Sequence, residues 1–394
     1  MTRIFLIRHA EAEGNLYRRA QGQYDSNITS LGRAQISALA ERFRDVPLDA
    51  LWVSDLHRTQ STASAIRKYH PDLQPNLTPR LREIDVGVWE DVAWGNIAAE
   101  YPCEMVLFTH DPARWSVPGG EPYEALYTRM RDVMLELGNT YPDQTVAVVS
   151  HGLAIRCLLC HILGITSEKF DSLPYGDNSS VSLITAENGD LHVEWYNDAS
   201  HLDRAGLSTF ARQTWRMQEQ KRVPVRDIYT RYEPLDPGAE GAYYTQVYAD
   251  TWQASHGSLQ GFVPSVYLAS AKACVRRDPR CLMKLYMGDE AAGVIQLDPD
   301  RGAEEGAGWI SLLYVDPRFR GRRLGIQLVG HAVSYFRRAG RTVLRLHTAD
   351  DNKNALGFYE HNGFRSLETV AGAAGQLHLM EADISPRILT PEEI

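Results

Sequence analysis

The sequence predicts an α/β protein of two domains, and three observations support this fold class. The chain has 394 residues, more than one ordinary hydrophobic core supports. Over residues 1–202, short apolar runs alternate with amphipathic stretches, as expected of a mainly parallel sheet with helices on both faces. A basic segment with few apolar residues then breaks this rhythm, and a different order of helices and strands follows it.

The composition is that of a globular protein, with 44% hydrophobic and 23% charged residues. A net charge of −9 argues against a general role in binding nucleic acid or a membrane surface. No apolar run approaches the length of a membrane span, and residues 4–7 read as a strand rather than part of a signal peptide. Five scattered cysteines suggest a reducing compartment, so we expect a cytoplasmic protein. Cys157 and Cys160 form a CxxC inside an apolar helical run, which we interpret as core packing, and we expect no metal.

In the first domain, the expected strands are apolar runs bounded by polar or turn residues: 4–7, 51–53, 146–149, 181–186 and 191–195. The last two flank Asn188-Gly189, a strong hairpin signal. Thr29 is expected to cap a helix whose apolar positions, at helical spacing, are Ile36, Leu39, Ala40 and Phe43. Arg8-His9 and Ser150-His151-Gly152 each follow a strand. The carboxyl ends of parallel strands share one edge, where open α/β sheets bind ligands, so we expect the two histidines to meet there.

Residues of these types at such an edge suit phosphate chemistry. Transfer of a phosphoryl group needs a nucleophile, cationic clamps and a proton donor for the leaving oxygen. Arg8 places a guanidinium beside the His9 imidazole. Arg58 lies at a strand-to-helix junction, where the positive end of the helix also attracts an anion. Glu83 is a candidate proton donor, and His151 would add a second imidazole contact.

The first 202 residues resemble the histidine phosphatase superfamily, the phosphoglycerate mutase-like proteins. The matching motifs, in chain order, are Arg8-His9 with Glu13 and Asn15, Ser54 to Thr59, Arg82-Glu83 through Glu90, Pro118 to Glu121, Ser150-His151-Gly152, and Asn197 to Leu202. The stretch Gly87 to Glu90 is more similar to the broad phosphatases of the superfamily than to the mutases. Asp91 departs from the pattern, because a glycine is usual there, and Ile28 replaces a common leucine.

This resemblance implies a three-layer αβα fold and a ping-pong reaction without a metal. His9 would attack phosphorus and become phosphohistidine, Glu83 would protonate the leaving group, and water would then release phosphate. The residues implied to bind the phosphate are Arg8, Asn15, Arg58 and His151.

Residues 203–225 are expected to form a basic, solvated linker, and residues 226–384 a second domain followed by a tail at 385–394. The helices expected in the second domain cover residues 241–255, 264–277, 324–338 and 355–360. Its expected strands cover residues 282–287, 292–297, 309–315, 343–347 and 376–382.

Residues 315–325 combine a strand end, a turn, a basic loop with glycine, and a helix start. Backbone N–H groups and arginines in such a loop suit a pyrophosphate. With a second block at residues 352–364, this loop makes residues 226–384 resemble the GNAT family of N-acetyltransferases. Arg323 departs from the family pattern, because a second glycine is common there.

The GNAT resemblance implies a mixed, splayed sheet and direct transfer of an acetyl group from acetyl-CoA to an amine. Tyr359 would be the acid for the departing thiolate. The residues implied to contact acetyl-CoA are Leu313, Val315, Arg320, Gly321, Arg322, Arg323, Gly325 and Asn352.

The main interpretation is therefore a bifunctional enzyme that hydrolyses a small phosphomonoester and acetylates an amine. One alternative keeps the phosphatase and makes the second domain a non-catalytic, acyl-CoA-binding regulator. Another makes the first domain a phosphoglycerate mutase-like phosphomutase. We expect no nucleic acid or membrane partner.

Overall fold

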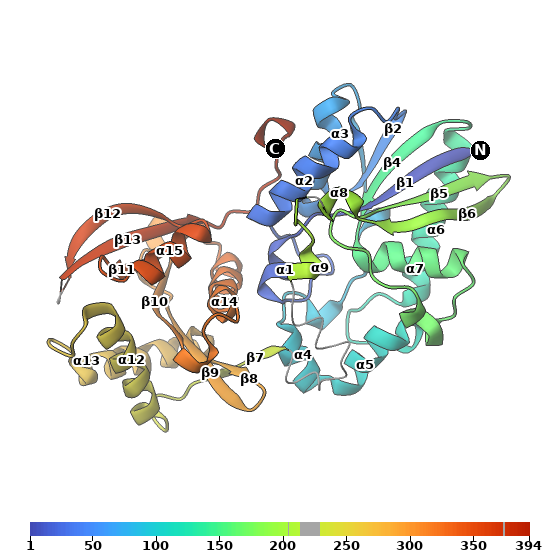
Figure 1. Cartoon of the computed structure of the whole chain (residues 1–394). Coiled ribbons are helices and arrows are strands. Elements are labelled where there is room, and N and C mark those ends of the chain that lie inside the picture. The colour runs from blue at the N-terminus through green and yellow to red at the C-terminus, as the bar shows by residue number, and fades with distance from the viewer. Residues whose placement is uncertain (204, 213–228, 373–374) are drawn as a thin grey trace. The chain divides into compact units, whose positions relative to one another are not determined.

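The computed structural model describes residues 1–203, 205–212, 229–372 and 375–394, which divide into two compact units (Figure 1). The first unit comprises Met1–Pro224 together with Pro386–Ile394, and the second comprises Val225–Ser385. The chain thus returns to the first unit after completing the second, so all of the expected tail at 385–394 except Ser385 is part of the first unit. Of the expected linker, residues 205–212 pack in the first unit, and residues 213–225 lie outside the described residues.

The first unit is built on a six-stranded sheet of order β3-β2-β4-β1-β5-β6. Its strands are β1 (Thr2–Arg8), β2 (Ala50–Ser54), β3 (Pro75–Thr78), β4 (Thr145–Ser150), β5 (Val181–Glu187) and β6 (Asp190–Asp198). The first four run parallel, and β5 and β6 form an antiparallel hairpin. In the centre, Arg8 of β1 lies opposite Ser150 of β4, so both strands end at the same level.

Helices cover both faces of this sheet, as the sequence predicted. The pair α2 and α3 packs on one face, and α6 and α7 pack on the other (Figure 1). The helices of the first unit are α1 (Glu13–Tyr17), α2 (Ser30–Phe43), α3 (His57–Tyr69), α4 (Trp94–Glu100), α5 (Pro102–His110), α6 (Tyr123–Thr140), α7 (Gly152–Ile162), α8 (Ser200–Asp203) and α9 (Thr209–Arg212). Thr29 caps α2 by accepting a hydrogen bond from the Gly32 N–H at 3.0 Å, which confirms its predicted role.

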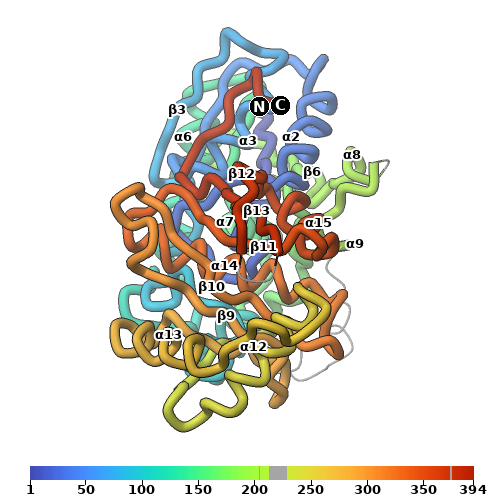
Figure 2. The backbone as a smooth tube through the Cα atoms, turned by 90° about the vertical axis from the view of Figure 1, so that its left-hand side faces the viewer, coloured from blue at the N-terminus to red at the C-terminus, as the bar shows by residue number. Residues whose placement is uncertain are grey.

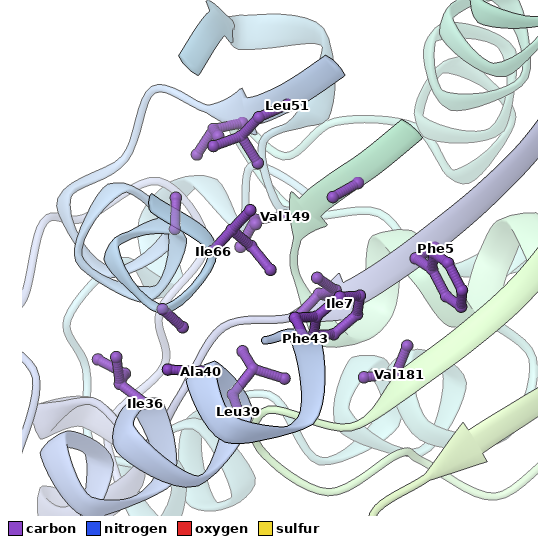
Figure 3. Close-up of a cluster of buried hydrophobic side chains, with 14 of the residues drawn as sticks. Phe5, Ile7, Ile36, Leu39, Ala40, Phe43, Leu51, Ile66, Val149 and Val181 are labelled. Atoms are coloured by element: carbon purple, nitrogen blue, oxygen red, sulfur yellow. The ribbon is translucent and has the colours of Figure 1, made fainter. Parts of the chain in front are cut away.

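Alternate residues of the strands form the core under α2 and α3 (Figure 3). Phe5 and Ile7 of β1 point to this side, and the Phe5 ring packs edge-on against Phe43 at 5.4 Å between centroids. The predicted helical stripe of α2 supplies the opposing surface. Cys157 and Cys160 are fully buried in α7, as their interpretation as core residues required.

The second unit is built on a seven-stranded mixed sheet of order β12-β13-β11-β10-β9-β8-β7. Its strands are β7 (Thr230–Pro234), β8 (Leu282–Met287), β9 (Glu290–Asp298), β10 (Ala307–Val315), β11 (Val343–Ala349), β12 (Arg365–Gly372) and β13 (Gly375–Asp383). Its helices are α12 (Gly241–His256), α13 (Pro264–Arg277), α14 (Leu324–Arg338) and α15 (Lys353–His361). Within the described ranges, no helix in either unit has the length and apolar character needed to cross a membrane.

Among the described residues of the second sheet, the only parallel pairing is between β10 and β11, and it is short. Residues 307–310 pair with residues 343–346, after which the two strands separate. A β-bulge between Ile310 and Leu312 marks the point of separation. The predicted splay is therefore present, and it leaves the side of β10 that faces β11 without a strand partner from Leu312 to Val315.

Candidate functional site

The structure brings the predicted phosphate-site residues together at the carboxyl edge of the first sheet. His9 directly follows β1 and His151 directly follows β4, and their ring centroids lie 5.3 Å apart. Arg58 lies in the first turn of α3, and Glu83 follows a 3₁₀ turn at Pro79–Leu81. These side chains, with that of Arg8, are buried.

His9 is held in the form that a nucleophile needs. Its Nδ1 lies 2.7 Å from the carbonyl oxygen of Ala10, which can only accept a hydrogen bond. The neutral ring therefore carries its proton at Nδ1 and leaves the Nε2 lone pair available. Burial, followed by the charges of Arg58 and Arg8, lowers the pKa of His9 well below its ordinary value. The imidazole is thus uncharged at neutral pH.

His151 presents an unsatisfied polar atom. Its Nε2 lies 2.8 Å from Ser54 Oγ, whereas its buried Nδ1 has no hydrogen-bond partner in the described part of the chain. Burial is again the main cause that lowers the pKa of His151, with Arg58 and His9 next. An unpaired buried donor costs about 1–3 kcal/mol, so this nitrogen is suited to pair with a ligand.

Arg58 is fixed by a loop rather than by a carboxylate. Its Nη1 donates to the Tyr24 carbonyl at 2.9 Å and its Nη2 to the Gly22 carbonyl at 2.6 Å. The side chain is completely buried, and its Nε has no partner among the described residues. Two carbonyls thus orient the guanidinium while leaving its charge uncompensated by direct contact, as suits an anion-binding residue.

Glu90 holds the loop at residues 22–24 in place through hydrogen bonds between its carboxylate and the loop backbone. Its carboxylate accepts hydrogen bonds from the backbone N–H groups of Gly22, Gln23 and Tyr24, at 3.2, 2.6 and 3.0 Å. Glu90 therefore positions the two carbonyls that orient Arg58. From the sequence, Glu90 belongs to a matching motif but has no predicted role, because three contacts to a loop 66–68 residues away leave no local pattern.

The Glu83 carboxyl lies at the N-terminus of α7. It accepts hydrogen bonds from the N–H groups of Leu153 at 3.0 Å, Ala154 at 2.9 Å and Ile84 at 3.1 Å. These contacts fix the carboxyl group against Leu153 and Ala154, the second and third residues after His151.

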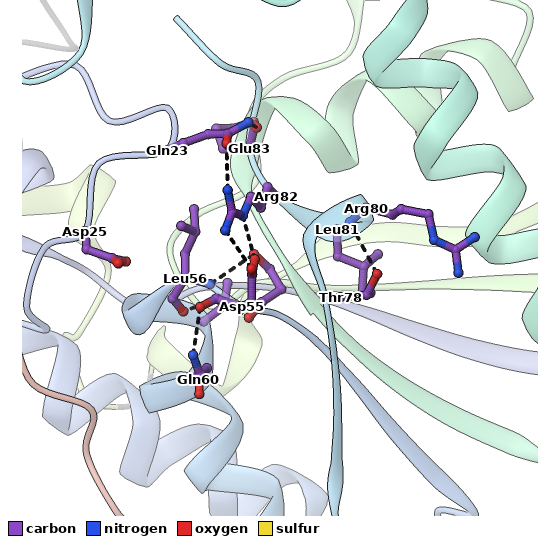
Figure 4. Close-up of polar contacts among 12 residues, drawn as sticks. Gln23, Asp25, Asp55, Leu56, Gln60, Thr78, Arg80, Leu81, Arg82 and Glu83 are labelled. Carbon is purple, nitrogen blue, oxygen red and sulfur yellow. Dashed lines mark hydrogen bonds and ion pairs between the residues drawn. The ribbon is translucent and has the colours of Figure 1, made fainter.

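Further residues around Glu83 brace its loop. Arg129 of α6 donates to the Glu83 carbonyl at 2.9 Å and forms a two-point ion pair with Glu121. Arg82 forms a two-point ion pair with Asp55, both bonds at 2.6 Å, and contacts Gln23 (Figure 4). Arg129 was missed by the sequence analysis, because one arginine in an amphipathic helix carries no signal.

Arg8 and Asn15 are fixed close to His9. Arg8 donates to the Gly176 carbonyl at 2.6 Å, and its guanidinium lies over Gly152, where an added Cβ would come within 3.1 Å of Nε. Asn178, which is fully buried, donates to the His9 carbonyl at 3.1 Å and to Asn15 Oδ1 at 3.4 Å. Asn178 is thus a second supporting residue that the sequence analysis missed.

The departure at Asp91 has a structural explanation. Asp91 has a φ of +56°, a left-handed conformation that favours glycine and tolerates aspartate. Its carboxylate also forms a buried ion pair with Arg19, at 2.7 Å. The ion pair gives this chain a contact that a glycine could not make.

In the second unit, the basic loop begins where β10 ends. Gly321 has a φ of +75° and open space around its Cα, and Arg323 precedes α14 with a left-handed φ of +59°. Arg320 donates to the Val315 carbonyl at 3.1 Å, and the Arg322 guanidinium lies 5.3 Å from the Phe319 ring. The first turn of α14 has no side-chain cap, so its N–H groups suit an anion.

Three further residues predicted to act in the second unit, Gly325, Asn352 and Tyr359, make packing or hydrogen-bond contacts within it. Gly325 faces Phe358, where a Cβ would come within 3.1 Å of the ring, so its small size permits contact between α14 and α15. Asn352 caps α15 by accepting the Ala355 N–H at 3.1 Å. Tyr359 is buried between two phenylalanines, and burial raises the pKa of its phenol, which therefore stays protonated at neutral pH. Among the described residues of both units, no group of three or more His, Cys, Asp and Glu side chains could hold a metal ion.

Comparison with known proteins gives two family matches. Residues 4–199 match the histidine phosphatase superfamily (branch 1), and residues 242–364 match the acetyltransferase (GNAT) family. Phosphoserine phosphatase 1 of Hydrogenobacter thermophilus is 33% identical over 202 residues, which cover 51% of this chain and 95% of that protein. The probable phosphoglycerate mutase GpmB of Enterobacter sp. (strain 638) is 32% identical over 217 residues, which cover 54% of this chain and all of that protein.

Among solved structures, Bacillus stearothermophilus YhfR aligns with a TM-score of 0.49 and 29% identity, over 52% of this chain and all of that one. The chain belongs to the histidine phosphatase superfamily, and its second unit carries a domain of the GNAT acetyltransferase family.

Proposed function

We propose that the first unit hydrolyses phosphomonoesters through a phosphohistidine at His9. The observation that carries this proposal is the 2.7 Å contact between His9 Nδ1 and the Ala10 carbonyl oxygen, which keeps the ring proton on Nδ1 and leaves Nε2 to act as the nucleophile. Nε2 attacks phosphorus as the bond to the leaving oxygen breaks, and Glu83 gives that oxygen a proton. Water then attacks phosphorus, and Glu83 takes the proton of this water. The phosphorus–nitrogen bond breaks, which releases phosphate and returns His9 to its neutral form.

The surrounding groups stabilise the transferring phosphoryl group. Arg8 and Arg58 contribute positive charge in a buried setting, where it acts strongly. His151, which accepts the Ser54 hydroxyl at Nε2, donates through Nδ1 to a phosphoryl oxygen. Asn15 supplies a further polar contact. A relative named as a phosphatase supports hydrolysis, whereas relatives named as probable mutases keep phosphomutase activity as an outcome of the test.

We further propose that the second unit transfers an acetyl group from acetyl-CoA to an amine. The separation of β10 and β11 would admit the pantetheine arm of acetyl-CoA beside Leu313 and Val315, and the loop from Arg320 to Gly325 would bind the pyrophosphate. The amine nitrogen attacks the acetyl carbonyl, the carbon–sulfur bond breaks, and Tyr359 protonates the departing thiolate. The proton that the amine nitrogen loses is released to solvent, and Tyr359 takes up a proton from solvent to return to its neutral form. All five cysteines are free thiols, which supports a cytoplasmic setting.

The test of the first activity is phosphate release from a panel of phosphomonoesters, such as phosphoserine, 3-phosphoglycerate and p-nitrophenyl phosphate. His9→Ala is expected to lower release at least about 10³-fold. The control is His192→Ala, on an exposed position of β6. Undiminished release by His9→Ala would overturn the proposal, and transfer of phosphate between substrate positions without release would identify a phosphomutase.

The second activity is tested by release of free thiol from acetyl-CoA with a panel of amines. Tyr359→Phe is expected to slow release while acetyl-CoA still binds. If no amine yields thiol but acetyl-CoA binds and alters phosphate release, the second unit is a regulator. Failure of the chain to bind acetyl-CoA would overturn both interpretations of the second unit, as an acetyltransferase and as a non-catalytic regulator.

A further inference from the structure

Residues 386–394, here called the C-terminal strap, pack along α3 of the first unit (Figures 1 and 2). Leu389 is only 3% exposed and joins the hydrophobic core beneath α2 and α3. Its N–H donates to Ser61 Oγ at 3.0 Å, and its carbonyl accepts the Ser64 hydroxyl at 2.6 Å. Lys68, one turn further along α3, donates to the Ile394 carbonyl at 2.7 Å. One face of α3 thus holds the strap through residues at helical spacing.

The same helix also carries the phosphate site. Arg58 lies in its first turn. One turn later, Thr62 accepts the N–H of Ala10 at 3.0 Å and donates to the Arg58 carbonyl at 2.7 Å, so it ties α3 to the residue after His9. A shift of α3 would therefore move Arg58 relative to His9.

A second contact of the strap leads toward Asn15. The Arg387 N–H donates to Asn27 Oδ1 at 2.9 Å. Asn27 is paired in turn with Glu13, through its backbone N–H to the Glu13 carboxylate and its carbonyl to the Glu13 N–H, both at 2.9 Å. Glu13 is the first residue of α1, which carries Asn15. The strap thus contacts the supports of two residues in the proposed phosphate site.

The strap lies outside the part of the chain that matches the histidine phosphatase superfamily. The match to the histidine phosphatase superfamily ends at residue 199. The alignment with the GpmB relative extends over 217 residues, which cover 54% of this chain and all of that protein.

We propose that the C-terminal strap is a positioning element of the phosphatase site, so that phosphate binding by the first unit depends on a segment that follows the acetyltransferase domain. The inference rests on the proposed phosphatase function for its activity readout. Loss of the strap would leave a cavity where Leu389 packs in the core and would remove the hydrogen-bond partners of Ser61 and Ser64. It would thereby remove contacts that hold α3, the helix that carries Arg58.

The test uses the full chain with Leu389→Ala and, as a matched control, Ile388→Ala, whose side chain is 41% exposed. Leu389→Ala is expected to lower the unfolding midpoint of the first unit by about 5 °C. At a temperature well below that midpoint, it should also lower kcat/KM for phosphate release about tenfold and raise the Kd for inorganic phosphate by a similar factor. Ile388→Ala should change none of these quantities.

A second variant lacks residues 386–394, and a synthetic peptide of that sequence is then added. Recovery of phosphate binding with the peptide supports the proposal. A wild-type Kd for inorganic phosphate in folded Leu389→Ala, or in the deletion variant without peptide, would overturn it. If the wild-type chain binds phosphate but hydrolyses no ester, the proposed function fails, and the phosphate Kd still decides the role of the strap.

Discussion

The Glu90→Gln substitution tests whether the loop that orients Arg58 depends on one buried carboxylate. In the wild-type chain, Oε1 accepts the Gln23 N–H at 2.6 Å, and Oε2 accepts those of Gly22 and Tyr24 at 3.2 and 3.0 Å. Glutamine retains one carbonyl oxygen, which can keep the Gln23 contact. Its NH₂ group would then face two N–H donors, so those donors lose their acceptor.

Two lost hydrogen bonds to a charged group correspond to a decrease of about 3 kcal/mol in the free energy of unfolding. The larger functional effect is expected at Arg58, whose two acceptors are the carbonyls of Gly22 and Tyr24. A displaced loop would misplace the guanidinium, so kcat/KM for phosphate release should fall about 10- to 100-fold.

The assay combines denaturant unfolding with steady-state phosphate release at a temperature where the variant is folded. Glu100→Gln, on an exposed position of α4, is the control and should match the wild type in both. A Glu90→Gln variant with wild-type stability and wild-type kcat/KM would refute the assignment of Glu90 as a positioning residue.

Three further predictions concern individual residues. Gly152→Ala places a Cβ within 3.1 Å of Arg8 Nε, so kcat/KM should fall about tenfold with little change in the unfolding midpoint; unchanged kinetics would contradict this packing. Because the folded chain holds the pKa of His9 and His151 below the ordinary value of 6.5, the unfolded chain binds more protons just below that pH. The contribution of these two histidines to the free energy of unfolding should therefore be fully present above about pH 6.5 and be lost as the pH falls below that value. Between about pH 7.5 and about pH 5.5, the thermal unfolding midpoint should decrease less for His151→Gln than for the wild type. Arg323 has a left-handed φ, which glycine adopts at lower cost than alanine. The free energy of unfolding of the second unit should therefore be about 1 kcal/mol higher in the Arg323→Gly variant than in the Arg323→Ala variant. Equal values in denaturant titrations would contradict backbone strain at Arg323.

Much of the fold could be predicted because its signals are local. The hairpin at Asn188-Gly189, the cap at Thr29 and the helix Leu324–Arg338 each depend on neighbouring residues, and the structure confirms all three. Short elements without a strong period, such as β3 and β7, were not predicted. Both lie at sheet edges, where pairing on one side supplies the stability that the local sequence lacks.

The central residues of the candidate site could be predicted from the sequence, whereas the residues that hold them in position could not. Arg8 ends β1, and His9 and His151 directly follow β1 and β4, whose ends parallel pairing brings together, so chain position alone indicates that they meet. Glu90 and Asn178 act through contacts to loops distant in the chain, and side chains of these types occur throughout any surface. Their roles appear only when the loop geometry is known.

The strap shows most clearly what a linear reading omits. Leu389 contacts serines more than 320 residues earlier, and its own neighbours form no helix or strand pattern that would mark it as a core residue. In sequence order the strap is a short tail after the second domain, whereas in space its Leu389 joins the core of the first unit. The chain order therefore makes the second unit an insertion between two parts of the first. If the strap proposal holds, a change that pulls residues 386–394 away from α3 would reach Arg58 through Ser61, Ser64 and Thr62, without any contact between the two ligand sites.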